Sequence, residues 1–293
     1  MFANAYGLAA GYTWPVVISA RHWDGTVRCS CGAFVILNDA GWVATAAHVL
    51  DSFFTFQKHA EEIRAHREAA NAIEEDVALN FKQKRKKLGR LAANPMWITN
   101  HSFWWGKDGL ELRDVSAIRG PDLAIGRLEP FDRTWVPNYP TIKDPTRGLQ
   151  PGSSLCRLGF PFHAINATFD PQREVFDLPK GTLPIPRFPL EGIYTRNVVL
   201  GEGAKHKYES KFLETSSPGL MGQSGGPIFD VRGTVWSIQS KTKHLELGFS
   251  PRVRKNGREV EENQFLNVGW GVHPEVLVAF LSDNGINFQR SDY

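Results

Sequence analysis

The chain has 293 residues, of which 42% are hydrophobic and 22% are charged, as in an ordinary globular protein. Its formal net charge of +3 is too small to indicate a nucleic-acid-binding protein. No run reaches the roughly 18 apolar residues that a membrane-spanning helix needs. We therefore expect one or two compact domains, and neither a membrane nor a nucleic acid as partner.

The cysteines and the first 20 residues bear on the cellular compartment. Cys29, Cys31 and Cys156 are the only cysteines, and residues 1–20 lack the Lys or Arg of a secretory signal. Cys29 and Cys31 with His22 could form half of a metal site, but no second pair completes it. We expect reduced thiols, no metal or other cofactor, and a cytoplasmic location.

Residues 15–50 have the composition of β-strands, and the following segment has that of a helix. The predicted strands cover 15–19, 28–37 and 42–46, with turn residues at 38–41. Residues 54–91 contain no proline and no glycine before Gly89, and Ala, Glu, Lys and Arg dominate. Apolar residues recur there every seven positions, which predicts a long helix inserted between two strands.

The basic run 82–90 lies at the end of this insertion. It has the composition of a solvated helix terminus, where cations stabilise the helix dipole. The alternative is a contact with nucleic acid or an acidic partner.

The rest of the chain returns to strand character. A proline-rich crossing at 135–140 is the expected linker, and six prolines in the loop 161–189 disfavour regular structure there. Apolar residues at helical spacing predict a helix over 273–284, ended by Gly285. The other predicted strands are 97–98, 102–105, 110–113, 123–125, 153–160, 191–200, 211–215, 227–230, 234–240 and 265–272.

The most informative motifs are GQSGGP at residues 222–227 and TAAH at residues 45–48. A serine hydroxyl is a poor nucleophile unless a base lies within hydrogen-bond reach, and the base needs a third group to hold its tautomer. Ser224 and His48 are the candidate nucleophile and base. Alternatives are an ordinary glycine-rich turn and a buried structural histidine.

Asp122 is the candidate third group. It directly precedes the apolar triplet 123–125, which would bury its carboxylate. Asp114 and Asp108 are rivals, but the first lies beside Arg113 in a strand and the second in a turn. The order His, Asp, Ser is that of chymotrypsin, and it differs from those of subtilisins and α/β-hydrolases.

These residues carry a family resemblance. Residues 213–227 resemble, without a gap, the nucleophile loop of chymotrypsin-fold (trypsin-like) serine peptidases, and in detail the bacterial HtrA-like branch of the catalytic domain. Residues 228–240 are similar to the hairpin that follows this loop, and residues 34–49 to the segment carrying the histidine. Residues 51–96 match nothing in the core fold.

The resemblance implies an all-β fold of two six-stranded antiparallel β-barrels, with a helical insertion at about 52–94, a C-terminal helix and no PDZ domain. The implied domains are 1–136 and 137–293. The family's oxyanion hole falls on the backbone N–H groups of Gly222 and Ser224. Secreted members have a disulfide at the position of Cys31, but its partner position holds Val49, so that disulfide cannot form.

Gln223 departs from the pattern of trypsin, where an aspartate before the nucleophile pairs with a newly cut N-terminus. That activating ion pair is absent, so the site must form alone or be ordered by substrate, a partner or the insertion. The resemblance makes Pro218, Gly219, Leu220 and Met221 the floor of the primary specificity pocket. None is acidic, which favours a small or medium apolar residue at P1, the residue whose carbonyl is attacked.

Ser240 and Lys241 are further candidate substrate-binding residues, because a substrate strand would pair beside them. The sequence thus predicts a serine endopeptidase acting on protein or peptide substrates. Alternatives are a catalytically silent protease-like binding or scaffolding module, and an esterase-type acyl hydrolase. The helical insertion is the expected docking site of a regulatory protein partner.

Overall fold

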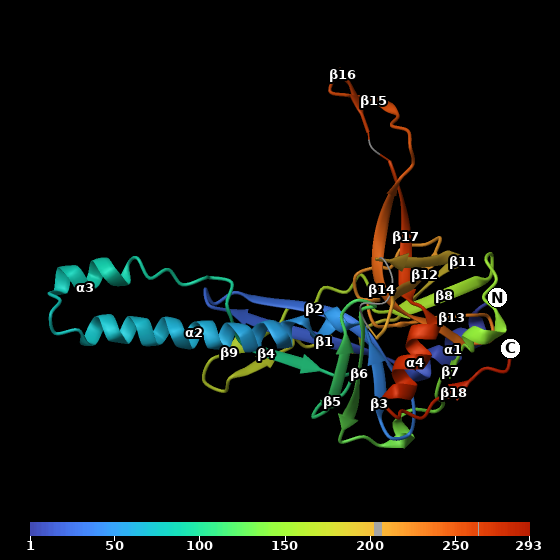
Figure 1. Ribbon diagram of the computed structural model, residues 1–293, viewed down its shortest axis with the longest axis horizontal. Coiled ribbons are helices and arrows are strands. Elements are labelled where there is room, and N and C mark those ends of the chain that lie inside the picture. The colour runs from blue at the N-terminus through green and yellow to red at the C-terminus, as the bar shows by residue number, and fades with distance from the viewer. Residues whose placement is uncertain (202–206, 263) are drawn as a thin grey trace.

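The computed structural model describes residues 1–201, 207–262 and 264–293 (Figure 1). The N-terminal half forms a six-stranded antiparallel sheet in the order β4-β1-β2-β3-β6-β5. Its first three strands fall almost wholly in the segment 15–50, whose β-branched content predicted strands. The strands are β1 (Thr13–His22), β2 (Val27–Ile36), β3 (Trp42–Thr45), β4 (Ile98–Trp104), β5 (Glu111–Ile118) and β6 (Leu123–Glu129).

The C-terminal half forms an eight-stranded sheet in the order β13-β8-β11-β12-β17-β14-β7-β18, with β13 also pairing with β14. Its main strands pair antiparallel, while the two-residue strands β7 and β18 pair in parallel. The strands are β7 (Thr141–Ile142), β8 (Ser154–Gly159), β11 (Phe188–Leu200), β12 (Ser210–Thr215), β13 (Pro227–Phe229), β14 (Val235–Glu246), β17 (Phe265–Val272) and β18 (Gln289–Arg290).

The predicted chymotrypsin-like arrangement of two β-sheet units is confirmed. In the described part of the chain the second sheet has two more strands than expected, the short β7 and β18. One apolar cluster contains Phe34 and Leu123 from the first sheet and Leu158 and Phe229 from the second. The two sheets therefore share a core.

Two terminal helices cover the second sheet. The predicted C-terminal helix is confirmed as α4 (Pro274–Asp283), which buries Leu277 and Leu281. Helix α1 (Ala3–Tyr12) was not expected; Tyr12 donates a hydrogen bond to Gly233 O, and Phe2 packs against Phe229. The domain boundary between residues 136 and 137 stays a prediction. Helix α1, which precedes that boundary, contacts the C-terminal sheet.

The predicted insertion consists of two helices, α2 (Asp51–Glu75) and α3 (Phe81–Leu88), instead of one. The helix is interrupted at 76–80, and a new helix begins there because Asn80 caps α3 in a reciprocal capping box with Gln83. The first half of α2 lies against the N-terminal sheet, and its second half and α3 project beyond the sheets (Figure 1). Among the described residues, no helix is long and apolar enough to cross a membrane.

Three features of the loops complete the fold. The loop 161–189 contains a small hairpin, β9 (Thr168–Asp170) and β10 (Val175–Asp177), where no regular structure was expected. The strands β14 and β17 continue into a projecting hairpin, β15 (Arg252–Lys255) and β16 (Arg258–Glu261) (Figure 1). Short 3-10 helices cover Ala47–Leu50 (η1), Arg133–Trp135 (η2) and Pro145–Arg147 (η3).

Close approach between the sheets depends on Gly225. Its φ is +83°, and a Cβ atom there would lie 2.1 Å from both Ala33 O and Thr45 Oγ1. Ala33 N in turn donates to Ser224 O at 2.8 Å. The loop 222–227 can therefore contact β2 and β3 only with a glycine at this position.

Gly225→Ala is expected to destabilise the fold by about 3–5 kcal/mol, because left-handed strain adds to the overlap with Ala33 and Thr45. Gly25→Ala is the matched control: Gly25 has φ +85° but no atom within 4 Å of the added Cβ. This control should lose only about 1–2 kcal/mol. Urea unfolding of both variants measures the difference, and equal losses would contradict the role assigned to close approach.

Candidate active site

His48 lies on η1, directly after β3. Ala47, Val49 and Leu50 are buried and anchor the turn, whereas the His48 side chain is 42% exposed. The pairing of Thr45 with Ala124 sets the register of β3 against β6. Continued past the strand ends, that register places Asp122 opposite Ala47, whose backbone N donates to Asp122 O at 3.2 Å, and so next to His48.

Asp122 holds His48 at two points. Its Oδ2 accepts from His48 Nδ1 at 2.8 Å, and its Oδ1 accepts from the backbone N of His48 at 2.9 Å. Ser240 Oγ, from the second sheet, donates to Oδ2 at 2.5 Å. Asp122 has φ +64°, an uncommon conformation for a residue other than glycine and one enriched at functional sites. With Nδ1 donating, Nε2 of His48 remains free to accept a proton.

The two rival aspartates lie elsewhere. Asp114 accepts a hydrogen bond from Arg127 Nε at 3.0 Å, and Asp108 accepts one from Trp104 Nε1 at 2.7 Å. Asp122 is thus the one of these three that contacts His48.

The pKa values of the pair shift in opposite directions. The hydrogen bond to Asp122 raises the pKa of His48, outweighing burial, which lowers it. Burial alone would raise the pKa of Asp122, but hydrogen bonds from His48 and Ser240 lower it below the usual value. The resting pair is therefore a carboxylate that favours the imidazolium form of His48.

The loop carrying Ser224 is ordered by its own residues. Gln223 is fully buried; its Oε1 accepts from Leu220 N at 2.9 Å, and its Nε2 donates to Phe188 O at 3.3 Å. Gln223 stands at the position where trypsin has a charged aspartate. Its hydrogen bonds hold the loop without a charge.

The backbone donors of this loop divide into two groups. The N–H groups of Gln223, Gly225 and Gly226 donate to backbone carbonyls. Those of Gly222 and Ser224 donate to no acceptor in residues 1–201, 207–262 and 264–293. The two N–H groups predicted for the oxyanion hole are therefore unpaired within the described residues.

Ser224 and His48 lie on segments that pack against each other. Ser224 O bonds Ala33 N, and Gly225 packs against Ala46 N, two residues before His48. Within the described ranges no hydrogen bond joins the side chains of Ser224 and His48. Catalytic hydrogen bonds are often long in a free enzyme and tighten when substrate binds.

The candidate substrate-binding residues lie in two places. Pro218, Gly219 and Leu220 are half-buried, and Met221 is 92% exposed. Ser240 is buried and its hydroxyl bonds Asp122, so it positions the carboxylate instead of facing the solvent. The Nζ of Lys241 lies 4.4 Å from the centre of the Phe212 ring.

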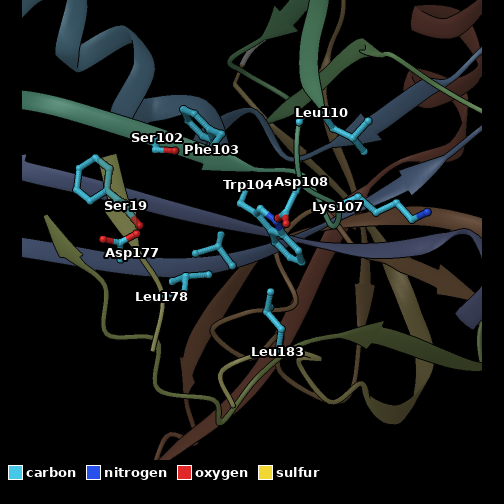
Figure 2. Close-up of a pocket in the computed structure, with 13 residues that line it drawn as sticks. Ser19, Ser102, Phe103, Trp104, Lys107, Asp108, Leu110, Asp177, Leu178 and Leu183 are labelled. Carbon is cyan, nitrogen blue, oxygen red and sulfur yellow. The ribbon is translucent and has the colours of Figure 1, made fainter. Parts of the chain in front are cut away.

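A groove of about 510 Å³ lies between β4 and the loop containing β10 (Figure 2). Trp104, Asp108 and Asp177 are among its lining residues. Val17 also lines it and pairs with Cys31 on β2, the strand that contacts Ser224 O. None of His48, Asp122 and Ser224 lines this groove, so it is distinct from the candidate active site.

Arg157 was missed by the sequence analysis. It is 1% exposed and lies in β8, where it bonds the segment 215–218 and Gln239. A lone arginine inside the otherwise apolar run 155–160 is the signal that could have identified it.

The cysteines and acidic residues do not gather into a metal site in the part of the chain described. Cys29, Cys31 and Cys156 are free thiols. No group of three or more His, Cys, Asp or Glu side chains is placed to hold an ion among these residues.

Fold and site together define a chymotrypsin-like peptidase domain. The family model described as a trypsin-like peptidase domain matches residues 30–238, and the chain belongs to this family. A search of curated proteins found no match.

Solved structures that are similar to the chain include those of HtrA-type and other proteases. A variant of the HtrA-type protease AlgW with a decapeptide has a TM-score of 0.50 and 13% identity over 97% of this chain and 68% of that chain. The Rv3671c protease from M. tuberculosis in its active form has a TM-score of 0.49 and 13% identity, over 98% of this chain and 87% of that one. In another AlgW structure the chain covers 63% of the protein's length.

The pKa of His48 is expected to lie above its ordinary value of about 6.5. Asp122→Asn should lower it, because the amide cannot stabilise the imidazolium. NMR titration of the His48 ring in the wild type and in the variant measures both values. An unchanged His48 pKa in Asp122→Asn would contradict the electrostatic coupling.

Proposed function

We propose that the chain is a serine endopeptidase in which Ser224, His48 and Asp122 form the catalytic triad. Ser224 Oγ attacks the peptide carbonyl carbon while His48 Nε2 takes its proton. Asp122 holds the Nδ1–H tautomer and stabilises the imidazolium. The N–H groups of Gly222 and Ser224 donate to the developing oxyanion, where one such donor typically contributes about 3–4 kcal/mol.

The second half of the reaction reverses these roles. His48 gives its proton to the leaving amine, so the C–N bond breaks and an acyl ester remains on Ser224. Water then attacks this ester, with its proton going to His48, and the product acid leaves as Ser224 regains the proton. No group outside the chain and water is required.

The observation that supports this proposal most directly is the pair of hydrogen bonds that Asp122 accepts from His48. The carboxylate bonds both the ring Nδ1 and the backbone N of His48, and Ser240 bonds the same carboxylate. A purely structural histidine would not need a free Nε2 and 42% exposure of its side chain. The unpaired N–H groups of Gly222 and Ser224 support the same reaction.

A peptide substrate suits the edge of β14. Within the described residues, the segment 241–246 pairs only with β17, so its other edge is open to an added strand. The similar AlgW structures contain a tripeptide or a decapeptide, which supports a peptide ligand for this fold. We propose a cytoplasmic location on the three free thiols.

Ser224→Ala is expected to abolish hydrolysis of a protein substrate such as casein and labelling by a fluorophosphonate probe, because no other group supplies the nucleophile. Its unfolding midpoint should stay within a few degrees of the wild type. Ser282→Ala, an exposed serine on α4, is the matched control and should retain both activities.

The outcomes separate the candidate functions. Wild-type cleavage rates in Ser224→Ala would end the proposal. Labelling without cleavage of any peptide would favour the esterase-type hydrolase, and a fully folded wild type that neither labels nor cleaves would favour the binding module.

We further propose that the insertion docks a protein partner or substrate. The half of α2 near the sheet is fixed: Ile98 N donates to His59 Nδ1 at 2.9 Å, and Trp97 Nε1 donates to Glu62 Oε2 at 2.6 Å. Ile63, in the same part of α2, is buried. The distal half and α3 are mostly exposed and carry the basic run 82–90. The arrangement suits a projecting arm on an anchored base.

Replacing residues 70–89 by a Gly/Ser linker is expected to leave hydrolysis of a short peptide unchanged, because the anchored half of α2 is retained. Cleavage of a protein substrate, or binding of a protein partner, should change several-fold. Both rates are measured on the same preparations, with charge reversal of Lys84, Lys86 and Lys87 in the full chain as a second variant. Unchanged rates and binding in both variants would remove the proposed role.

A further inference from the structure

The guanidinium of Arg157 is buried behind the segment predicted to form the primary specificity pocket. Its Nε donates to Gln239 Oε1 at 2.9 Å. Its Nη1 reaches Ser217 O, Ser217 Oγ and Pro218 O at 2.8, 2.6 and 3.0 Å, and its Nη2 bonds Thr215 Oγ1. All these acceptors are neutral, and the described residues provide no carboxylate within ion-pair distance.

An isolated buried cation is costly, and proteins normally pair it with an anion. Burial lowers the pKa of Arg157 to about 10, so the group is still charged at neutral pH. Carbonyl and hydroxyl dipoles satisfy its N–H groups but do not cancel its charge. The neighbourhood of residues 217–219 therefore carries a net positive potential.

The peptide bond between Pro218 and Gly219 is oriented with its oxygen toward Arg157 and its N–H toward the substrate side. Because Pro218 O points to the guanidinium and a trans peptide is planar, the N–H of Gly219 points to the opposite side. That N–H donates to no acceptor in the part of the chain described. Gly219 Cα itself lies against the Gln239 amide, which Arg157 also holds.

Access from the substrate side is open at this position. Ser217, Pro218 and Gly219 are half-exposed, whereas Arg157 behind them is 1% exposed. Gly219 O is occupied by the Thr242 hydroxyl at 2.6 Å, so the free group of this residue is its N–H. An anionic ligand here would find a hydrogen-bond donor backed by a full positive charge.

We propose that Arg157 determines the specificity of this site by selecting an acidic side chain, glutamate or aspartate, at P1. The inference rests on the proposed serine endopeptidase function. The P1 carboxylate accepts from Gly219 N–H and provides the counter-charge that Arg157 lacks. Arg157 acts through the peptide that it orients and does not itself touch the substrate, so it is a positioning residue.

This selection differs from the apolar P1 residue that the sequence favours. That expectation uses only the residues before the nucleophile, none of which is charged. Arg157 lies about sixty positions upstream and enters the site only through the pairing of β8 with β11 and β13. A lysine or arginine at P1 is disfavoured both by the lack of an acidic residue in 218–221 and by the positive charge of Arg157.

The test compares kcat/KM for four peptides that differ only at P1: Glu, Gln, Val and Lys. Glutamine is nearly isosteric with glutamate, so the Glu/Gln ratio isolates the charge. We expect wild type to prefer Glu over Gln by about tenfold or more, and over Lys by more than that. A preference for Val with a Glu/Gln ratio near one would overturn the proposal.

Variants assign the preference to Arg157. Arg157→Met should bring the Glu/Gln ratio close to one, while Arg157→Lys should keep part of it. Arg147→Met, an exposed residue on η3, removes the same charge and should leave the ratio unchanged. An equal loss in Arg147→Met would mean that net charge, not the buried site, sets the ratio.

The wild-type ratio decides the proposal even where Arg157→Met fails to fold. Cleavage that is lost in Ser224→Ala but shows no Glu preference sustains the proposed function and overturns this inference. If no peptide is cleaved, calorimetry with product peptides ending in Glu or Gln replaces the rates. Tighter binding of the Glu peptide would support the site, and equal or absent binding would overturn it.

Discussion

The buried carboxylate of Asp122 is the interaction on which the rest of the site depends. It collects three hydrogen bonds, two from His48 of the first sheet and one from Ser240 of the second. These bonds offset the cost of burying a charge and tie the two sheets at one point. The left-handed backbone of Asp122 stores strain that this network maintains. The orientation of His48 is thus a property of both sheets and not of η1 alone.

The second constraint is steric. Gly222 and Gly225 have φ near +90°, and a Cβ atom at either would overlap backbone atoms of Phe160 or Ala33. In this turn Gly222 N–H and Ser224 N–H pair with no acceptor within the described residues, while the N–H groups of Gln223, Gly225 and Gly226 do. Unpaired donors cost free energy in the resting protein, and they become useful only when negative charge develops in front of them. The glycine turns at 222 and 225 thus combine the close packing of this loop with the unpaired N–H groups that we propose donate to the oxyanion.

The sequence predicted those parts of the molecule in which chemistry and local pattern coincide. The two-sheet fold and the terminal helix followed from strand composition, helical spacing and a motif resemblance, and the family model confirms the family. Other parts depend on partners far away in the chain. The single predicted helix of the insertion became two because the capping box of Asn80 and Gln83 competes with helix continuation. The hydroxyl of Ser240, a predicted substrate-binding residue, bonds Asp122, a contact between residues 118 positions apart that no local pattern indicates.

Arg157 illustrates why specificity is harder to read from a sequence than catalytic residues. A triad must contain particular residue types, so motifs reveal it. A specificity site needs only a potential and a shape, and a residue behind the visible wall can supply both. Asp122 and Arg157 are both buried charges held by dipoles, but Asp122 contacts a titratable partner and Arg157 has only neutral acceptors. A charge left without a counter-ion inside a protein is most simply explained when its counter-ion arrives with the ligand.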